Sequence, residues 1–441
     1  MGSGVGYYQR KSGHDSRRSR TSGTGYSGSY LLAVQHEVLM HVISRVKAML
    51  PRCVVALGGP EFLGHNEDFL RTNRFVDCVF RGEGEETFPQ WLACWQQPKE
   101  WTRITGLCFL DAEGQYHDNG LSRVMAFDKL VNPEQSPFFN WSKPFVQLET
   151  TRGCFNTCAF CVSGGEKPVR TLSVEAIRER VRLIHEKGIR NIRVLDRTFN
   201  YQSHRAKALF DLFREFPDMR FHLEIHPALL SEELKKELAS MPKGLLHLEA
   251  GIQSLHEEVL TVSRRAGKLA DALEGLRYLC ALDNMETHAD LIAGLPLYHL
   301  SQIFDDVRTL AEYRAGEIQL ESLKLLPGTE MRRRAEELGI CYSPLPPYEV
   351  LQTREITPRR ITDSPPAIAS ARRILQRTGL AGNHPPSDCG RARLSDTFPG
   401  SPDSNRDHRP AHGTGATGYP ALPFLQGALP SFPDRHEPGM D

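Results

Sequence analysis

Apolar and polar positions follow a repeating strand–helix rhythm between residues 141 and 353. Six short apolar runs predict buried strands, at 145–150, 191–196, 220–225, 245–251, 286–292 and 317–324. Helical patterns lie between them, and Ser173 and Ser231 are placed to cap two of these helices. Repeated units of this length predict parallel strands joined by right-handed crossovers. We therefore expect an α/β fold, an incomplete (β/α)6 TIM-like barrel with its site at the carboxyl ends of the strands.

A shorter α/β pattern precedes the barrel, over residues 31–98. It contains a helical stretch and two apolar runs, the first stopped by Gly58-Gly59-Pro60 and the second followed by Arg81-Gly82-Glu83-Gly84-Glu85. This order of elements predicts a fragment of a sheet domain. Residues 99–140 show no comparable pattern, and we interpret them as a linker.

The two ends of the chain differ from this pattern in composition. Residues 1–30 are rich in Gly, Ser, Arg and Tyr, and residues 354–441 are rich in Pro and Gly. Segments of this kind bury too little apolar surface to offset the entropy of ordering, so the sequence predicts that both ends are disordered.

Charge and hydropathy indicate where the protein is located and which partners it binds. The chain has 54 basic and 54 acidic residues and no formal net charge, so no net field favours nucleic acid or an anionic membrane. The sequence contains neither a long apolar segment nor the apolar centre of a signal peptide. We expect a cytoplasmic protein that binds neither nucleic acid nor membrane.

Three cysteines are close together directly after the first predicted barrel strand, in the segment Cys154-Phe-Asn-Thr-Cys158-Ala-Phe-Cys161. Ten cysteines in 441 residues are too few for a disulfide framework, and clustered thiols in a reducing compartment indicate a metal site. Three thiolates suit a [4Fe–4S] cluster with one iron left open to chelate a small molecule. A structural zinc site is the alternative, although zinc would need a fourth ligand that no nearby cysteine supplies.

This loop resembles that of the radical S-adenosylmethionine (SAM) superfamily, and the resemblance extends over residues 52–353. It is strongest to members with an N-terminal cobalamin (B12)-binding-type domain. The further segments that carry it are Leu195-Asp-Arg-Thr-Phe-Asn200, Phe221-His-Leu-Glu-Ile225, Leu248-Glu-Ala-Gly-Ile-Gln-Ser254, Asp290-Leu-Ile-Ala-Gly-Leu-Pro296 and Pro347-Tyr-Glu-Val-Leu-Gln-Thr353. Residues 31–98 would then be part of a Rossmann-like cobalamin-binding-type domain.

The resemblance implies an enzyme whose [4Fe–4S] cluster, held by Cys154, Cys158 and Cys161, reductively cleaves SAM to a 5′-deoxyadenosyl radical. Its substrate is not identified, and a low-potential electron donor such as flavodoxin or ferredoxin is implied. The residues implied to contact SAM are Phe160, Glu224, Gly251, Gln253, Ser254, Asp290 and Gly294. Two alternatives stay open: a cobalamin-dependent radical SAM methyltransferase, and a truncated non-catalytic iron–sulfur protein.

The sequence also departs from this family. Asp196 and Arg197 stand where relatives have a Gly-rich motif for the SAM amino group. A complete cobalamin-type domain would begin with a further strand and helix, which the Gly/Ser-rich start replaces, and no D-x-H-x-x-G segment is present. We therefore expect no tight cobalamin binding. The atypical ends suggest the hypothesis of a shifted reading frame or a misassigned gene boundary.

Overall fold

The computed structural model describes residues 26–30 and 36–357. Disorder was predicted for residues 1–30 and 354–441, of which residues 1–25 and 358–441 lie outside these ranges. Residues 26–30 instead form a strand. The α/β class with a parallel sheet is confirmed, and the described chain contains two main sheets. No helix among the described residues is long and apolar enough to cross a lipid bilayer.

The first sheet contains five strands in sequence order. They are β1 (Tyr26–Tyr30), β2 (Val54–Gly58), β3 (Cys78–Phe80), β4 (Leu107–Leu110) and β5 (Tyr116–Asp118). The first three pair in parallel and the last two are antiparallel. The helices of this part are α1 (His36–Met49), α2 (Glu67–Thr72) and α3 (Thr87–Cys94).

Two features of this sheet differ from the expectations. The strand that we expected to be missing is present as β1, which pairs with β2 from Tyr26 to Tyr30. Parallel pairing satisfies backbone groups whatever the side chains, so a Gly/Ser-rich segment gives no apolar signal for it. Residues 99–140, interpreted as a linker, supply β4 and β5, which extend the sheet beyond β3.

The second sheet has six parallel strands in the order β13-β12-β11-β10-β9-β6. Their bounds are β6 (Val146–Leu148), β9 (Asn191–Val194), β10 (Arg220–Ile225), β11 (Leu246–Gln253), β12 (Glu286–Ala293) and β13 (Glu317–Ser322). All six overlap the predicted runs. Among the described strands no pairing joins β13 to β6, so the sheet is open.

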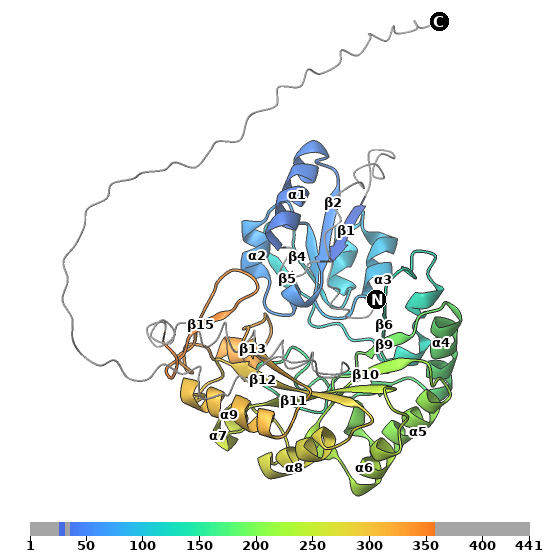
Figure 1. Cartoon of the computed structure of the whole chain (residues 1–441). Coiled ribbons are helices and arrows are strands. Elements are labelled where there is room, and N and C mark those ends of the chain that lie inside the picture. The colour runs from blue at the N-terminus through green and yellow to red at the C-terminus, as the bar shows by residue number, and fades with distance from the viewer. Residues whose placement is uncertain (1–25, 31–35, 358–441) are drawn as a thin grey trace, which may run out of the picture. The chain divides into compact units, whose positions relative to one another are not determined.

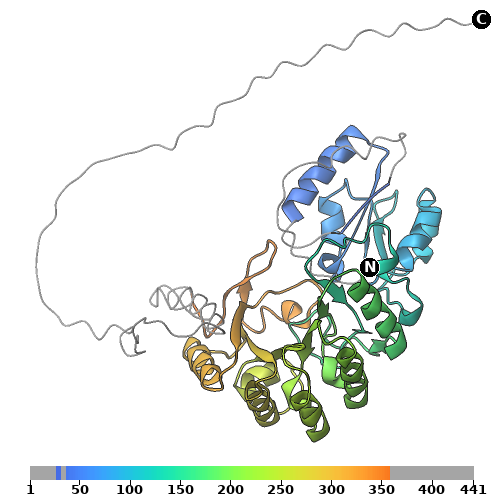
Figure 2. The same cartoon turned by 45° about the vertical axis from the view of Figure 1, so that its right-hand side comes forward.

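Helices cover one face of this sheet (Figures 1 and 2). They are α4 (Val174–Glu186), α5 (Ser203–Arg214), α6 (Glu232–Ala239), α7 (Glu257–Val262), α8 (Leu269–Cys280) and α9 (Leu300–Glu312). The predicted caps are present, since Ser173 Oγ accepts a hydrogen bond from Ala176 N at 3.1 Å and Ser231 Oγ accepts one from Leu234 N at 3.2 Å. The short elements β7 (Thr151–Arg152), β8 (Arg170–Thr171), α10 (Glu330–Arg333), β14 (Cys341–Tyr342) and β15 (Val350–Gln352) complete the described part.

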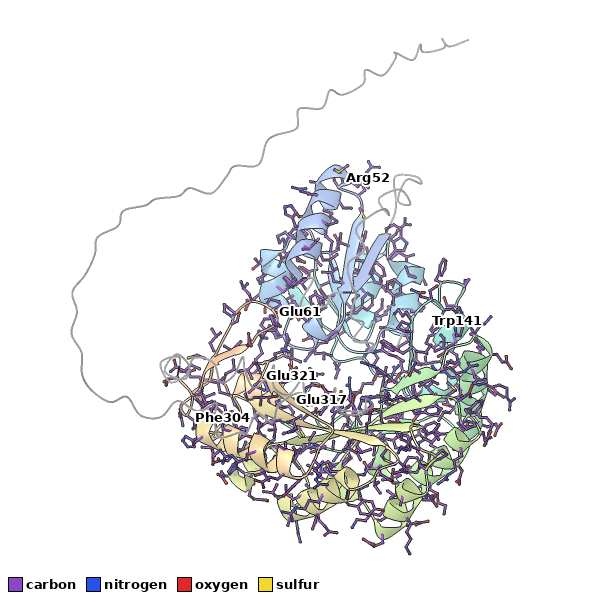
Figure 3. The ribbon with its side chains drawn as sticks, in the orientation of Figure 1. Arg52, Glu61, Trp141, Phe304, Glu317 and Glu321 are labelled. Atoms are coloured by element: carbon purple, nitrogen blue, oxygen red, sulfur yellow. The ribbon has the colours of Figure 1, made fainter. Side chains whose placement is uncertain are left out.

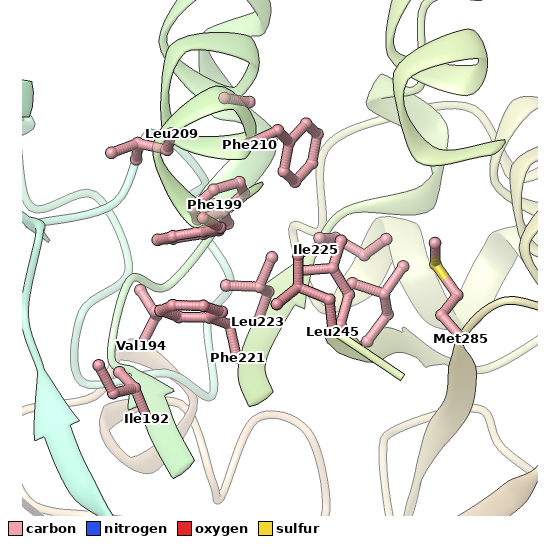
Figure 4. Close-up of a cluster of buried hydrophobic side chains, with 14 of the residues drawn as sticks. Ile192, Val194, Phe199, Leu209, Phe210, Phe221, Leu223, Ile225, Leu245 and Met285 are labelled. Carbon is pink, nitrogen blue, oxygen red and sulfur yellow. The ribbon is translucent and has the colours of Figure 1, made fainter. Parts of the chain in front are cut away.

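The core between the sheet and these helices decides which way the strand side chains point. Phe221, Leu223 and Ile225 of β10 are buried against the helices, and the ring of Phe221 stacks on Phe213 of α5 with centroids 4.0 Å apart. Figure 4 shows this packing around Phe221 and Leu223. Because successive side chains of a strand alternate between faces, the intervening residues of each strand point to the face away from the helices. That face carries the candidate site.

Candidate functional site

The cysteine loop leaves the sheet at the carboxyl end of β6. Strands β7 and β8 pair across its two ends and hold it as a compact turn. Cys154 N donates to the carbonyl of Glu166 at 3.0 Å, and Ala159 N donates to the carbonyl of Ser263 at 2.8 Å. All three cysteines are free thiols, with Cys154 8% and Cys158 7% exposed and Cys161 partly buried. The loop therefore presents three thiols without any disulfide to break.

A buried asparagine fixes the conformation of this loop. Asn156 is 3% exposed, and its Oδ1 accepts hydrogen bonds from Thr157 N at 2.9 Å and from Ala266 N at 3.0 Å. Gly164 allows the chain to pass closely, because a Cβ there would lie 2.4 Å from the carbonyl oxygen of Cys158. The thiols are thus positioned by backbone contacts before any metal binds.

Burial controls the protonation of the thiols. It raises the pKa of Cys158 to about 11, although Arg265, whose Nη1 is 3.8 Å from Cys158 Sγ, acts in the opposite direction. Burial likewise raises the pKa of Cys161. Metal binding must therefore release protons from these sites, and Arg265 favours the thiolate form at Cys158.

Two groups from the neighbouring strands are close enough to act electrostatically on the loop. Arg197 and Glu224 both influence the thiol of Cys161. Burial, assisted by the nearby negative charge of Glu249, raises the pKa of Glu224 to about 7. The structure therefore brings one of the expected SAM contacts, Glu224, to the cysteine loop.

Asp196 has a different environment from Arg197. Its Oδ1 accepts hydrogen bonds from the backbone nitrogens of Thr150 and Thr151, each at 2.8 Å, and its Oδ2 accepts one from the Thr150 hydroxyl. Burial raises its pKa, while these hydrogen bonds oppose that shift. Asp196 thus ties the end of β9 to the start of the cysteine loop, and at this strand end Arg197 is the residue that influences the thiols.

Gly251 and Gln253 lie close to the loop through Arg265. The guanidinium of Arg265 donates to the carbonyl of Gly251 and also reaches Cys158. Gln253 adopts a positive φ of 71°, and its Oε1 is a buried atom with no hydrogen-bond partner in the described chain. A buried acceptor without a donor costs about 1–3 kcal/mol, which makes this amide a candidate ligand contact.

The other expected contacts lie in different surroundings. Ser254 is fully buried and its Oγ accepts a hydrogen bond from His256 N at 3.2 Å. A Cβ at Gly294 would lie 3.4 Å from a methyl group of Val350, and Phe160 packs against a separate apolar cluster. Phe160 adjoins Cys161 in the sequence, whereas no hydrogen bond among the described residues joins Ser254 or Gly294 to the thiols. The roles of all three residues stay predictions.

Three histidines on the same face of the sheet were not identified from the sequence. His222, His247 and His288 occupy β10, β11 and β12, each two residues before an acidic residue, Glu224, Glu249 and Asp290 respectively. The register pairs His222 with His247 and Glu249 with His288. The repeated His-x-acid pattern in three successive predicted strands is the signal that could have revealed them.

These side chains form a closed group, which we call the histidine–carboxylate cluster: His222, His247, His288, Glu249 and Asp290. His222 Nε2 is 2.9 Å from Glu249 Oε2, His222 Nδ1 is 3.2 Å from His247 Nδ1, and His247 Nε2 is 3.2 Å from His288 Nδ1. His288 Nε2 is 3.4 Å from Glu249 Oε2 and 3.5 Å from Asp290 Oδ1. The cluster therefore links three strands on the face opposite to the helices.

The charges in this group are strongly perturbed. Burial and the neighbouring His222 lower the pKa of His247 to about 3, which keeps it neutral. Burial and Glu249 raise the pKa of Asp290 to about 9. Burial acts to raise the pKa of Glu249 as well, but the hydrogen bonds from His222, His288 and Asp290 together outweigh it and hold the pKa below its usual range. The cluster thus contains one firmly ionised carboxylate and a second that resists ionisation.

Comparison with known proteins identifies a sequence family that matches part of the chain. Residues 148–310 match the sequence model of the Radical SAM superfamily, which confirms the resemblance of the cysteine loop. Over 271 residues the chain is 27% identical to Hopanoid C-3 methylase of Methylococcus capsulatus, covering 58% of this chain and 50% of that protein. The chain thus spans about half the length of this relative.

Two solved structures share the fold. The radical S-adenosylmethionine methyltransferase TsrM from Kitasatospora setae, with tryptophan and a SAM analogue bound, aligns with a TM-score of 0.59 and 14% identity over 76% of this chain and 70% of TsrM. The cobalamin-dependent S-adenosylmethionine radical enzyme OxsB aligns with a TM-score of 0.53 and 15% identity over 70% of this chain and 52% of OxsB. At these identities the likeness concerns the fold.

Proposed function

We propose that the chain is an enzyme that generates a radical from SAM, because residues 148–310 match the sequence model of the Radical SAM superfamily. The observation that carries the proposal is the loop of three free thiols, Cys154, Cys158 and Cys161, at the carboxyl end of the first strand of a parallel sheet. Active sites of such sheets lie at this edge. For the fold of this part of the chain we propose an incomplete (β/α)6 barrel, because its six parallel strands form an open sheet.

The residues of the loop fit a [4Fe–4S] cluster. They offer three thiols, the type of ligand such clusters require, on a backbone that Asn156 and Gly164 already hold in place. When bound, the cluster supplies the electron that cleaves the carbon–sulfur bond of SAM, leaving methionine and a 5′-deoxyadenosyl radical that abstracts hydrogen from the substrate. Arg265 favours the thiolate at Cys158 and so assists binding of the metal.

SAM would lie along the face that bears Glu224, Gly251 and Gln253. The unpartnered Oε1 of Gln253 can accept a hydrogen bond from the nucleoside. Glu224 can accept one close to Cys161, and the missing side chain of Gly251 keeps the backbone approachable beside Gln253. We also place Phe160, Ser254, Asp290 and Gly294 in the SAM site. A small-molecule substrate and a low-potential donor such as flavodoxin or ferredoxin complete the proposal.

The experiment that tests the proposal is anaerobic reconstitution with iron and sulfide, followed by SAM and dithionite and identification of the nucleoside products. We expect 5′-deoxyadenosine from the unaltered protein and none from Cys158→Ala. Cys341→Ala is the matched control, because Cys341 is an exposed cysteine of β14 outside the loop, and it should retain the activity. Absence of 5′-deoxyadenosine from a protein that holds its full iron content would contradict the proposal.

We propose cobalamin-dependent methyl transfer as the second candidate function. The five-stranded sheet β1–β5 before the barrel supports it, since the strand we expected to be missing is present. However, the sequence offers no histidine in a D-x-H-x-x-G segment as a cobalt ligand. With hydroxocobalamin added to the same assay as the methyl acceptor, formation of S-adenosylhomocysteine together with 5′-deoxyadenosine would favour this candidate, and 5′-deoxyadenosine alone would favour the first.

A further inference from the structure

The histidine–carboxylate cluster has an unused nitrogen at its centre. His288 is 6% exposed, and its Nε2 has no hydrogen-bond partner among the described residues. Asp290 Oδ1 is buried and unpartnered as well. The two atoms face one another at 3.5 Å, and Glu249 Oε2 lies 3.4 Å from the same nitrogen. Buried polar atoms in folded proteins are normally hydrogen-bonded, so this arrangement requires an explanation.

The hydrogen bonds around the cluster determine which nitrogen atoms carry protons. The carboxylate of Glu249 can only accept, so His222 Nε2 must donate to it. In a neutral imidazole His222 Nδ1 then accepts from His247 Nδ1, and His247 Nε2 accepts from His288 Nδ1. His288 Nε2 is thereby left as a lone pair, directed at two carboxylate groups.

Two distances in this group match edges of a coordination tetrahedron. Ligand atoms about 2.0–2.2 Å from a tetrahedral zinc ion lie about 3.3–3.6 Å apart. The distances of 3.4 and 3.5 Å from His288 Nε2 to Glu249 Oε2 and Asp290 Oδ1 fall in this interval, and all three ligand atoms lie within 4.8 Å of one another. The hydrogen bond from His288 Nδ1 to His247 supplies the outer partner that metal-bound histidines usually have.

The charge of the surroundings also favours a cation. Glu224, Glu249 and Glu317 all act on Asp290 with like charge. Figure 3 shows Glu317 and Glu321 on β13, on the side of the sheet opposite to Phe304 of α9, and the register places Glu317 beside His288. His222 and His247 lie on β10 and β11 beside these carboxylates.

We propose that Glu249, His288 and Asp290 form a binding site for a divalent transition-metal ion, best suited to Zn²⁺, with His222 and His247 as its outer hydrogen-bond partners. One imidazole nitrogen and two carboxylate oxygens are ordinary zinc ligands, and a fourth position is left for water or for a substrate group. The site is separate from the cysteine loop. Asp290 has two carboxylate oxygens, so a metal ion on Oδ1 leaves the second for the nucleoside contact proposed above.

The test measures zinc on the iron–sulfur-reconstituted full chain, without SAM. After dialysis against Zn²⁺, iron and zinc are counted by mass spectrometry, affinity is measured by competition with a chromophoric chelator, and the zinc coordination shell is determined by X-ray absorption. We expect one zinc per chain with nitrogen or oxygen ligands at about 2.0–2.2 Å, and no sulfur shell at about 2.3 Å. The iron content shows independently whether the cysteine loop is filled.

Variants show whether this zinc occupies the histidine–carboxylate cluster. His288→Gln should weaken zinc binding at least about 100-fold, and His247→Gln, which removes only the outer partner, about 10–100-fold. His185→Gln is the matched control, because His185 pairs with Asp218 at 2.9 Å on an exposed helix, and it should bind zinc normally. Asp290→Asn is a second variant, for use if circular dichroism shows that His288→Gln does not fold.

Three results would overturn the inference. The first is that the chain binds less than one zinc ion, and the second is that the zinc has sulfur ligands. The third is that His288→Gln and Asp290→Asn both bind zinc with the affinity of the unaltered chain. If no stoichiometric zinc binds, a proton shared between Asp290 and Glu249 occupies the proposed metal position instead. None of these results depends on cleavage of SAM, so the proposed function can fail or succeed separately.

Discussion

Removing the side chain of Asn156 should release the cysteine loop from the rest of the site. In Asn156→Ala the backbone nitrogens of Thr157 and Ala266 lose their acceptor, at present 2.9 and 3.0 Å away. An unsatisfied buried donor costs about 1–3 kcal/mol. Thr157 and Ala266 are both exposed residues, so water can replace part of the lost acceptor at each nitrogen. We therefore expect the free energy of unfolding to fall by about 1–3 kcal/mol.

The functional consequence follows from the neighbour of Ala266. Arg265 reaches both Cys158 Sγ and the carbonyl of Gly251, so a displaced 264–266 turn carries this guanidinium away from the thiols. Iron content after reconstitution should therefore fall, and the remaining cluster should bleach faster in air. The measurements are urea unfolding of the cluster-free protein, and iron content with the decay of absorbance under oxygen.

Two control variants separate the loop effect from general destabilisation. Asn156→Asp keeps an oxygen acceptor at the same place and should retain most of the iron. Asn284→Ala also removes two side-chain hydrogen bonds, which Asn284 donates to the carbonyls of Leu238 at 2.9 Å and Met241 at 2.8 Å. These residues are far from the cysteine loop in the sequence. Asn284→Ala should lose stability while keeping its iron. If Asn156→Ala and Asn284→Ala retain the same iron content, the anchoring role assigned to Asn156 is wrong.

Three further predictions test other parts of the site. Glu224→Gln keeps the side-chain shape but removes the charge, so SAM should bind about ten-fold or more weakly in equilibrium dialysis, for a loss of about 1.5–3 kcal/mol, with iron content unchanged; equal affinity would remove Glu224 from the SAM site. Burial lowers the pKa of His226 to about 4, whereas an unfolded histidine has a pKa of about 6.5. Between these pH values the unfolded chain binds more protons than the folded chain, so the free energy of unfolding should fall as the pH drops from about 6.5 to 4. His226→Gln should flatten that part of the stability curve, and an unchanged curve would contradict the assignment. Because the sequence offers no D-x-H-x-x-G histidine, hydroxocobalamin should not be retained at micromolar protein in dialysis, and stoichiometric retention would overturn this expectation.

Local patterns were enough to predict the second sheet. Its six strands are apolar runs long enough to be recognised, and residues such as Phe221, Leu223 and Ile225 alternate with polar neighbours at the period of a strand. Ser173 and Ser231 were identified as helix caps for the same reason, because a cap acts within three residues. The cysteine loop is equally local, since three thiols within eight residues must meet on one turn.

The first sheet was harder to predict because its strands depend on partners far along the chain. Tyr26–Tyr30 has no apolar run of its own and is a strand because β2 offers backbone groups to pair with. Leu107–Leu110 and Tyr116–Asp118 lie outside the strand–helix repeat that revealed the equally short β6 and β9. Residue 356 also lies beyond the expected end of the barrel, yet Ile356 is buried in the core beside Leu325.

The sequence by itself determined the type of chemistry, and only the tertiary structure decided which side chains share a site. Strand periodicity shows that His222, His247 and His288 each lie on one face of a strand, but not that a common register brings their rings together. Arg265 contacts the cysteine loop, and Asn156 within that loop accepts a hydrogen bond from Ala266, across more than 100 residues of sequence. Register and long-range hydrogen bonds are properties of the packed sheet, because each requires two segments whose distance in the sequence says nothing about their distance in space.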